Sequence, residues 1–293
     1  MAANTTMRLG VAPRASRRFM LVQRMRKNKF VVAGGTVVLL IFLAALLAPV
    51  LAPYSPYEQH NTDQLLSPNS TYLLGTDDYG RDMLSRVLFG ARISIQVAVI
   101  SVSIGLGVGG FLGLIASYYG GWWDLVIMRV ADILFAFPAI LLAISVLALL
   151  GPSLANVMVA IGIIFIPIFT RVVRAAGMVL IHEEYVESSR ASGAGDMRIM
   201  FRHILPNALP PIMVQTTLAI SYAILSEAAL SFLGLGAQPP EPSWGTMLNT
   251  GRGFMSFAPW TGIVPGVAIF LAVLSFNVLG DGLRDVMDPR MKV

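Results

Sequence analysis

The chain has 293 residues, of which 56% are hydrophobic and only 13% are charged, with a mean hydropathy of +0.72. A soluble domain carries about a quarter of its residues as charged side chains, so the composition excludes that class and predicts a membrane protein. The formal charge of +5 does not come from one basic patch, which argues against a nucleic acid partner. The absence of cysteine excludes disulfides and thiol nucleophiles, and the three histidines show no metal-ligand spacing, so no metal site is predicted.

Residues 1–29 form a basic tail that holds eight of the 21 lysines and arginines and no acidic residue. Apolar residues alternate with arginines between Phe19 and Arg26, which predicts an amphipathic helix on an anionic membrane surface. Residues 30–52 then run without a charge. This run is longer than the apolar core of a secretory signal, which has about 7–15 residues, so it is predicted to be the first retained transmembrane helix.

Five more apolar runs follow the segment 53–91. Each is long enough to cross a hydrocarbon core of about 30 Å, and spans in a chain of this composition must be helices because lipid offers backbone groups no partner. The sequence therefore predicts an all-α membrane protein with six transmembrane helices, in which residues 92–280 form a five-helix core and residues 281–293 a tail. The predicted core spans are Ile93–Tyr118, Leu125–Leu150, Leu154–Thr170, Ala208–Leu235 and Thr261–Gly280.

The distribution of lysine and arginine predicts the orientation. With both termini in the cytoplasm, 16 of these residues lie on the inner side and four lie outside. Because cytoplasmic flanks carry the excess of basic residues, both termini are expected inside and the segment 53–91 outside. Arg129 lies within a span, near its cytoplasmic end.

The segment 185–207 lies between the fourth and fifth predicted spans and is too polar to cross a membrane. A helix that begins near Glu183 is expected to stop in the small, flexible run from Ser192 to Gly195. The orientation places this segment in the cytoplasm.

A second short helix, Met197–His203, is predicted after that stop. Asp196 is placed to cap its start, and Pro206 is expected to follow its end. Residues 183–206 are therefore predicted to form two short helices in an elbow at the membrane face.

The spacing within the elbow resembles the EAA signature of ABC-importer permeases, E-A-A-x3-G-x9-I-x-L-P. Serines replace both alanines, and His203 stands where the signature has isoleucine. In that family the elbow is the coupling helix, which docks in a groove on a cytoplasmic ATPase. The resemblance thus implies an ATPase-coupling surface made of Glu187, Ser188, Ser189, Arg190, Gly193, Leu205 and Pro206.

Three other stretches resemble the oligopeptide and dipeptide permeases called OppC or DppC. They are residues 74–82 (LGTDDYGRD), 232–247 and 277–289, so the resemblance extends from about Phe30 to the C-terminus. It implies a type I ABC-importer permease of the bacterial inner membrane, working with a second related permease, two ATPase subunits and an extracytoplasmic substrate-binding protein. Its extracytoplasmic motif contributes Gly75, Asp77, Asp78, Gly80, Arg81 and Asp82, within an acidic outer segment.

No motif in the chain predicts catalysis. Sequences of the type G-x-x-x-x-G-K-[ST], G-x-S-x-G and H-E-x-x-H are absent, so any ATP is expected on partner subunits and no cofactor on this chain. A G-x-G-x-x-G match begins at Gly105 but lies inside an apolar span, without the strand that a dinucleotide site needs. Gly105, Gly109 and Gly113 instead repeat every four residues, which predicts a close helix–helix contact.

Charged residues within spans are costly and mark structural or functional sites. Arg129 and Asp132 lie three residues apart on one predicted helix, so they are expected to pair, with a role in gating as the alternative. Glu227 shares its span with no basic residue. It is either a hydrogen-bonded structural carboxyl or a group facing the pathway. Kinks are expected in or beside the spans at Pro138, Pro167, Pro210, Pro211 and Pro265.

The sequence thus favours a permease subunit of an ATP-driven importer for di- or oligopeptides. Nickel, a nickel chelate or glutathione are alternative cargoes, since related permeases handle them. From other classes, an ion-coupled secondary transporter would need inverted repeats and buried ionisable groups, of which only Glu227 is present. A non-transporting membrane scaffold would need no cytoplasmic elbow.

Overall fold

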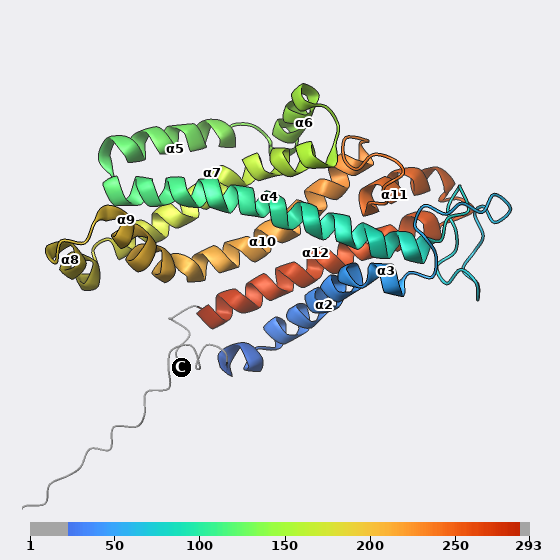
Figure 1. Cartoon of the computed structure of the whole chain (residues 1–293), viewed down its shortest axis with the longest axis horizontal. Coiled ribbons are helices and arrows are strands. Elements are labelled where there is room, and N and C mark those ends of the chain that lie inside the picture. Colours follow the sequence, from blue (N-terminus) through green and yellow to red (C-terminus); the bar gives the residue numbers. More distant parts are fainter. Residues whose placement is uncertain (1–22, 288–293) are drawn as a thin grey trace, which may run out of the picture.

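The computed structural model describes residues 23–287, and within that range it contains no β-strand beyond one isolated bridge between Thr76 and Asp82. Figure 1 shows an elongated helical bundle. We call the end that carries α8 the elbow end, and the end that carries residues 53–82 and α11 the loop end. Most of the predicted amphipathic helix of the tail lies outside the described residues.

Among the described residues, five helices are long and apolar enough to cross a membrane, or six if one bent pair counts as a single span, which confirms the predicted all-α membrane fold. The described helices include several short ones beside the spans. They are α2 (Lys29–Leu46), α3 (Ala48–Leu51), α4 (Met83–Tyr119), α5 (Gly121–Phe135), α6 (Ala139–Leu150), α7 (Leu154–Leu180), α8 (Glu184–Ala191), α9 (Asp196–Ile199), the π-helix η1 (Met200–Ile204), α10 (Leu205–Phe232), α11 (Trp244–Gly251), the 3-10 helix η2 (Arg252–Phe254) and α12 (Trp260–Met287).

The third predicted span is not one straight helix. Helices α5 and α6 meet at an angle of 89°, and α6 packs against α7 with Ala143 and Leu147 buried in the core (Figure 1). Pro138 precedes α6, and its ring both removes a backbone N–H and disfavours helical geometry at Phe137. The break therefore follows from the proline, but it is far sharper than the kink expected from the sequence.

Two spans are longer than predicted. Helix α4 begins at Met83, ten residues before the expected start, because the carboxylate of Asp82 caps it by accepting from the Ser85 amide at 2.8 Å. Helix α7 continues to Leu180 through the basic residues at which the apolar run stops. Apolar run length alone therefore underestimates both helices.

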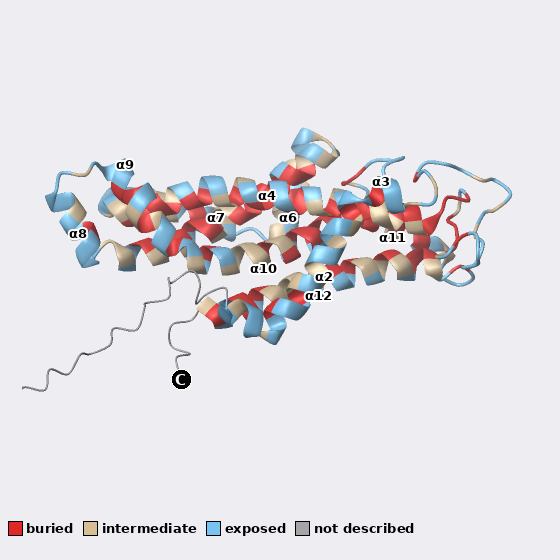
Figure 2. Cartoon of the chain, turned by 60° about the horizontal axis from the view of Figure 1, so that its bottom comes forward, coloured by how far each residue is buried: buried red, intermediate tan, exposed pale blue. Residues whose placement is uncertain are grey.

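Helices α4 and α7 form the central pair of the bundle, and a line of glycines lets them touch. A Cβ atom added to Gly105 would lie 2.3 Å from Cβ of Phe165, and one on Gly109 would lie 2.3 Å from the carbonyl oxygen of Ile166. At Gly113 the nearest atom, the carbonyl oxygen of Thr170, would be 2.6 Å away. The predicted small-residue contact is thus confirmed, and Figure 2 shows buried residues along this pair.

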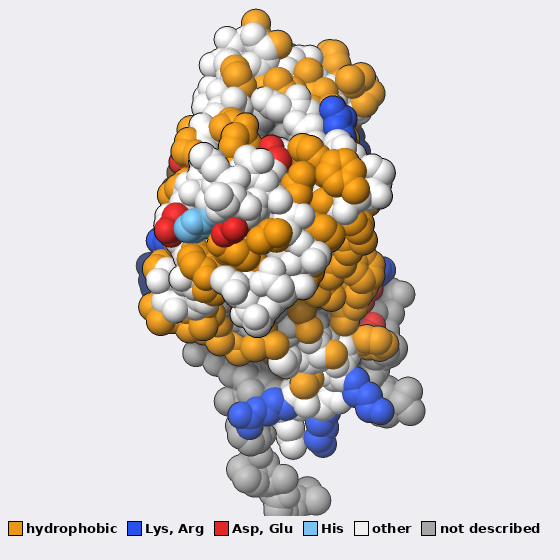
Figure 3. Space-filling view, turned by 90° about the vertical axis from the view of Figure 1, so that its right-hand side faces the viewer, with side chains coloured by type: hydrophobic (Ala, Val, Ile, Leu, Met, Phe, Trp, Pro, Cys, Tyr) orange, Lys and Arg blue, Asp and Glu red, His pale blue; other side chains and the backbone are white. Residues whose placement is uncertain are grey.

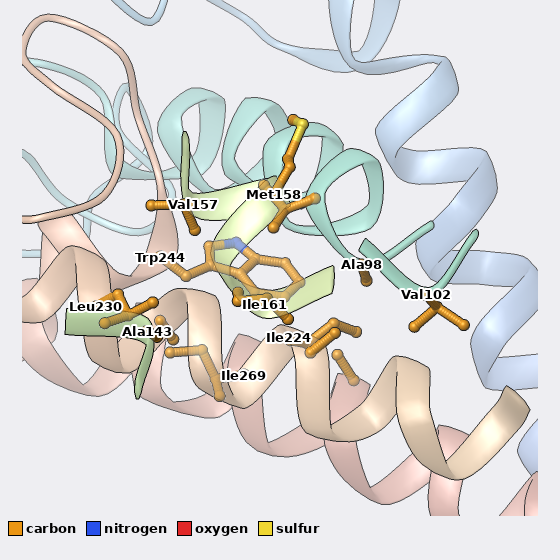
Figure 4. Close-up of a cluster of buried hydrophobic side chains, with 14 of the residues drawn as sticks. Ala98, Val102, Ala143, Val157, Met158, Ile161, Ile224, Leu230, Trp244 and Ile269 are labelled. Atoms are coloured by element: carbon orange, nitrogen blue, oxygen red, sulfur yellow. The ribbon is translucent and has the colours of Figure 1, made fainter. Parts of the chain in front are cut away.

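The apolar core thickens toward the loop end, around the indole of Trp244 on α11. Side chains from α4, α7, α10 and α12 surround this ring (Figure 4). The indole nitrogen donates to the carbonyl oxygen of Val87 at 3.0 Å, so the ring's one polar atom is satisfied. Trp244 thereby fixes the short helix α11 to the start of α4.

Helix α2 is attached to the outside of the bundle, mainly against α12 (Figure 2). Close contact is permitted by two glycines, since a Cβ on Gly34 would lie 2.6 Å from the Leu279 amide and one on Gly282 would lie 2.7 Å from the Val31 amide. Most of the remaining α2 surface is exposed and apolar, as suits a helix bordered by lipid.

Candidate functional site

The polar segment at the elbow end forms a bent arm, as the sequence predicts. Helix α8 begins at Glu184 with Glu183 at its N-cap, and it ends before the small-residue run. Gly193 has a φ of +79°, the left-handed conformation that glycine adopts at no steric cost. A Cβ on Gly193 or Gly195 would meet nothing within 4 Å. The two glycines of the turn between α8 and α9 therefore lie in the open, whereas Ala194 between them packs against buried apolar residues.

The predicted helix Met197–His203 does not end before Pro206. Helix α9, the π-turn η1 and α10 follow one another without a break, so a continuous helical path runs from Asp196 to Phe232. In the π-turn the Leu205 amide donates to the carbonyl oxygen of Met200, five residues back. This widened turn accommodates the proline that follows, which explains why the expected helix end is wrong.

The side chains of the predicted coupling surface lie mostly in the open. Glu187, Ser188, Arg190 and Gly193 are exposed and Ser189 is half-buried, whereas Val186 is the buried residue of α8. At the foot of the elbow, Leu205 is half-buried and Pro206 is exposed.

A groove of about 370 Å³ lies between the two arms of the elbow. No carboxylate lines it, so the groove is polar and basic. Its lining residues are Ser188, Ser189, Ser192, Gly193, Ala194, Arg198, Arg202 and His203. Such a surface suits contact with an acidic or hydrogen-bonding group on another protein.

An apolar cluster fixes the base of the elbow to the bundle. Val186 from α8 and Ile199 from α9 are fully buried against Leu114 of α4 and Val173 of α7. The elbow is therefore anchored by a small core of its own, separate from the core around Trp244.

Asp196 does not cap α9 with its side chain, as the sequence suggests. Gly195 is the N-cap residue, and the Asp196 carboxylate instead accepts hydrogen bonds from two tyrosines of α4. The hydroxyl of Tyr118 lies 2.7 Å from Oδ1, and that of Tyr119 lies 3.1 Å from Oδ2. Sequence reasoning missed this contact because it joins residues 77 and 78 positions apart.

The expected pair of Arg129 and Asp132 is only marginal. Their closest atoms are 4.0 Å apart on exposed side chains, whereas Asp132 lies 2.7 Å from Arg171 of α7. Asp124, in the first turn of α5, forms a second ion pair, with Arg174 of α7. The carboxylates of α5 thus pair across to α7 because an arginine of the neighbouring helix faces each of them.

Glu227 is fully buried at a junction of α10 with α4. Oε2 accepts from the Ser94 hydroxyl at 3.0 Å, and Oε1 accepts from the Ser231 hydroxyl at 2.7 Å. Ser231 in turn accepts from the Ala237 amide at 3.3 Å. This geometry is that of a hydrogen-bonded structural carboxyl, and the alternative role of Glu227 at the pathway stays a prediction.

The extracytoplasmic motif forms a compact knot at the loop end. Oδ1 of Asp77 accepts from the Tyr79 and Arg81 amides, both at 2.9 Å, and Oδ2 lies 2.6 Å from Nε of Arg81 and 3.4 Å from Nε of Arg86. Asp82 caps α4. The motif is therefore a dense polar network at the start of α4 that also includes Arg86.

Two glycines of this knot have positive φ values and crowded surroundings. Gly75 has a φ of +77° and Gly80 a φ of +70°. A Cβ on Gly80 would lie 1.9 Å from the carbonyl oxygen of His60, so only glycine fits there. The earlier part of the loop, at His60 and Leu66, thus lies directly against the two glycines of the motif.

The expectation of a strongly acidic outer face requires correction. Asp77 and Asp82 are buried and bonded within the knot, and Asp78 is half-buried, where burial and then the charge of Asp77 raise its pKa. Figure 3 shows a few acidic side chains and one histidine amid hydrophobic and uncharged groups on this face. Composition alone overstated the exposed charge because it does not reveal which carboxylates are buried and hydrogen-bonded within the folded chain.

An apolar cavity of about 310 Å³ opens where α5 and α6 diverge, against α7 and α10. Its walls are aromatic and aliphatic, including Phe135, Phe137 and Phe165, with Gln215 and Tyr222 as polar members. Within residues 23–287, no group of three or more histidines or acidic residues is placed to hold a metal ion.

Two family models match this chain, one near its N-terminus and one over most of the remainder. A model of binding-protein-dependent transport system inner membrane components matches residues 105–293, and a model of the N-terminal transmembrane domain of oligopeptide transport permease C matches residues 17–68.

Curated relatives cover nearly the whole chain. The dipeptide transport system permease protein DppC of Alkalihalophilus pseudofirmus is 48% identical over 270 residues, which are 92% of this chain and 89% of that protein. The glutathione transport system permease protein GsiD of Pectobacterium atrosepticum is 49% identical over 271 residues, covering 92% and 90%. Among solved structures, an inward-facing form of the MetNI methionine ABC transporter resembles the fold with a TM-score of 0.56 at 21% identity, covering 70% of this chain and 97% of that one.

Proposed function

This chain belongs to the family of inner-membrane components of binding-protein-dependent transport systems, and we propose that it is one of two permease subunits of an ATP-driven importer for di- or oligopeptides. The observation that carries the proposal is the exposed elbow, which bears the EAA-like residues on an arm anchored in the bundle. The relatives named for dipeptide and glutathione transport support the cargo class.

The elbow end faces the cytoplasm in this proposal, and so do both termini. Two ATPase subunits bind the ATP, and one of them docks on α8 and the basic groove beside it. Glu187 and Arg190 provide polar contacts, Gly193 provides the turn, and Leu205 and Pro206 join the arm to α10. Movement of the ATPases is passed through this arm into the transmembrane helices.

The loop end faces outward and receives an extracytoplasmic substrate-binding protein. Its rigid knot at residues 74–82 offers that protein a fixed surface, with few exposed charges (Figure 3). Cargo then passes along the interface between this subunit and a second, related permease. The bilayer surrounds the remaining apolar faces.

Glutathione is the second candidate cargo, and the relatives named GsiD favour it. It is itself a small peptide, so the same machine and the same class of pathway serve both candidates. Membership of a binding-protein-dependent family argues against the ion-coupled alternative.

The proposal is tested by purifying the tagged chain from its native membrane and identifying the proteins and small molecules that come with it by mass spectrometry. Two ATPases, a second permease and a binding protein that releases short peptides on denaturation are expected. The same proteins with glutathione or nickel would retain the machine and change the cargo. Recovery without any ATPase, in conditions that preserve such complexes, would contradict the proposal.

A further inference from the structure

The two tyrosines that end α4 share one carboxylate on the elbow. Tyr118 and Tyr119 each donate to a different oxygen of Asp196, and their rings meet edge to face with centroids 5.1 Å apart. Neighbouring residues of a helix point about 100° apart, yet both side chains reach the same carboxylate. We call these three residues the Tyr–Asp clamp.

The clamp contacts both arms of the elbow. Asp196 is the first residue of α9, and through η1 it stands at the start of the continuous helical path to Phe232. From the other arm, the guanidinium of Arg190 lies 5.5 Å from the ring centroid of Tyr118, within the range of a cation–π contact. Tyr118 therefore contacts both α8 and α9, on either side of the turn that contains Gly193.

Helix α4 connects the clamp to the opposite end of the molecule. It has 37 residues, a length of about 55 Å at 1.5 Å per residue, and begins at the Asp82 cap in the extracytoplasmic motif. Arg86, in its first turns, joins the ion pairs of that motif, and the glycine contacts bind its middle to α7. A displacement applied at the clamp therefore acts on a single helix that reaches the loop end.

We propose that Tyr118, Tyr119 and Asp196 are positioning residues that transmit movement of the elbow into α4, in addition to the direct route from α9 into α10. This inference rests on the proposed function. The apolar cluster of Val186 and Ile199 holds the elbow in place without the clamp, and the clamp residues are exposed or half-buried. Removing the clamp should therefore change transmission and leave folding and ATPase binding intact.

The test uses the complete importer in proteoliposomes, with its binding protein and a short peptide. Three variants of this chain are compared with the unmodified complex: Tyr118→Phe with Tyr119→Phe, Asp196→Ala, and all three changes together. Peptide transported per ATP hydrolysed is expected to fall between about two- and thirty-fold. Since each variant breaks the same contact, the combined variant should be no worse than the others. The control Tyr222→Phe removes a tyrosine hydroxyl on α10, outside both the elbow and the clamp, and should leave the ratio unchanged.

A second readout does not depend on the cargo. The chain has no cysteine, so Arg92→Cys, at an exposed site near the loop end of α4, provides a single reporter for a water-soluble maleimide. ATP binding is expected to change its labelling rate in the unmodified importer, and the clamp variants should abolish that change. If the peptide is not transported but this response is present and clamp-dependent, the cargo assignment fails and the clamp stands.

Three functional results would overturn the inference, and so would a fourth result on assembly. The functional results are an unchanged transport ratio in the clamp variants of a working importer, additive losses in the combined variant, and an ATP response of the reporter that is absent or indifferent to the clamp. Loss of the ATPase subunits from the variants would also overturn it, because the clamp would then belong to the docking surface.

Discussion

The two ends of the bundle use the same backbone device in opposite ways. Gly193 at the elbow and Gly80 at the loop end both have positive φ values. Around Gly193 there is open space, whereas a Cβ on Gly80 would collide with the carbonyl oxygen of His60. At the elbow most polar side chains are exposed, whereas in the knot the Asp77 side chain is buried. The elbow and the knot therefore differ in the packing around their glycine turns and not in the backbone conformation of those turns.

The largest effect on stability is expected in the knot, from Asp77→Ala. The substitution leaves Arg81 and Arg86 buried without their shared carboxylate, and breaking a buried ion pair costs about 3–5 kcal/mol. The thermal unfolding midpoint of the purified complex should fall sharply. A midpoint within a degree of the unmodified protein would show that the knot is not rigid.

Asp78→Asn is the matched control in the same knot. Burial and the neighbouring charge of Asp77 raise the pKa of Asp78 in the folded protein. Stability from this group is therefore present below its unfolded pKa and falls as pH rises through its folded pKa. Asparagine resembles the protonated form, so the midpoint at pH 7 should be unchanged or higher, with a weaker decline between acidic and neutral pH. A clear loss at pH 7 would contradict this.

Glu227→Ala should rank second. It leaves the Ser94 and Ser231 hydroxyl hydrogens without their acceptor and opens a cavity between α4 and α10, at a cost of about 2–4 kcal/mol. Glu227→Gln keeps the volume and the capacity for both hydrogen bonds, so its cost should be clearly smaller. Thermal unfolding of both variants decides the point. Equal losses would mean that the charge, and not the hydrogen-bonded shape, is what the site requires.

The contact between α4 and α7 offers a closely matched glycine pair. Gly109→Ala forces the backbones apart, and such overpacking costs about 1–3 kcal/mol. Two residues away, a Cβ on Gly107 meets nothing within 4 Å, so Gly107→Ala should be neutral or slightly stabilising. The thermal unfolding midpoint of Gly109→Ala should therefore lie below that of Gly107→Ala. Similar midpoints would contradict the close approach of the helices.

The smallest effect on stability, with the largest effect on coupling, is expected from Gly193→Asp. Aspartate tolerates a left-handed backbone better than most residues, so the cost in stability should be about 1 kcal/mol. The new carboxylate nevertheless projects from the turn that docks on the ATPase, so membrane insertion should persist while transport is uncoupled from ATP hydrolysis. Gly195→Ala, with a φ of −68° and open surroundings, should keep both activities. Full transport by Gly193→Asp would contradict the lever role of the elbow.

The sequence predicted what local chemistry determines. The start of α8, its stop in the small-residue run and the glycine contact of α4 all follow from neighbouring residue types, and the structure has them where expected. Contacts between distant segments were not predictable in this way. The residues next to Asp196 in the sequence predict that it caps a helix, yet its hydrogen-bond partners lie on α4. Asp132 likewise pairs with Arg171 of another helix.

The effect of each proline on its helix was likewise not predictable from the sequence. Pro138 breaks a span by 89°, whereas Pro206, Pro210 and Pro211 remain within a continuous helical path. The difference lies in whether a neighbouring turn can widen to absorb the missing hydrogen bond, as η1 does, and a single sequence does not reveal that.

The ion pairs between α5 and α7 have a consequence for the order of biosynthesis. Helix α5 leaves the ribosome before α7 and brings Asp124 and Asp132 toward the membrane before Arg174 and Arg171 exist to neutralise them. Helix α6 has 12 residues, about 18 Å, which is too short to cross the bilayer by itself. We therefore expect the bent pair to reach its final depth only after α7 has been made, so that this part of the protein integrates late and as a unit.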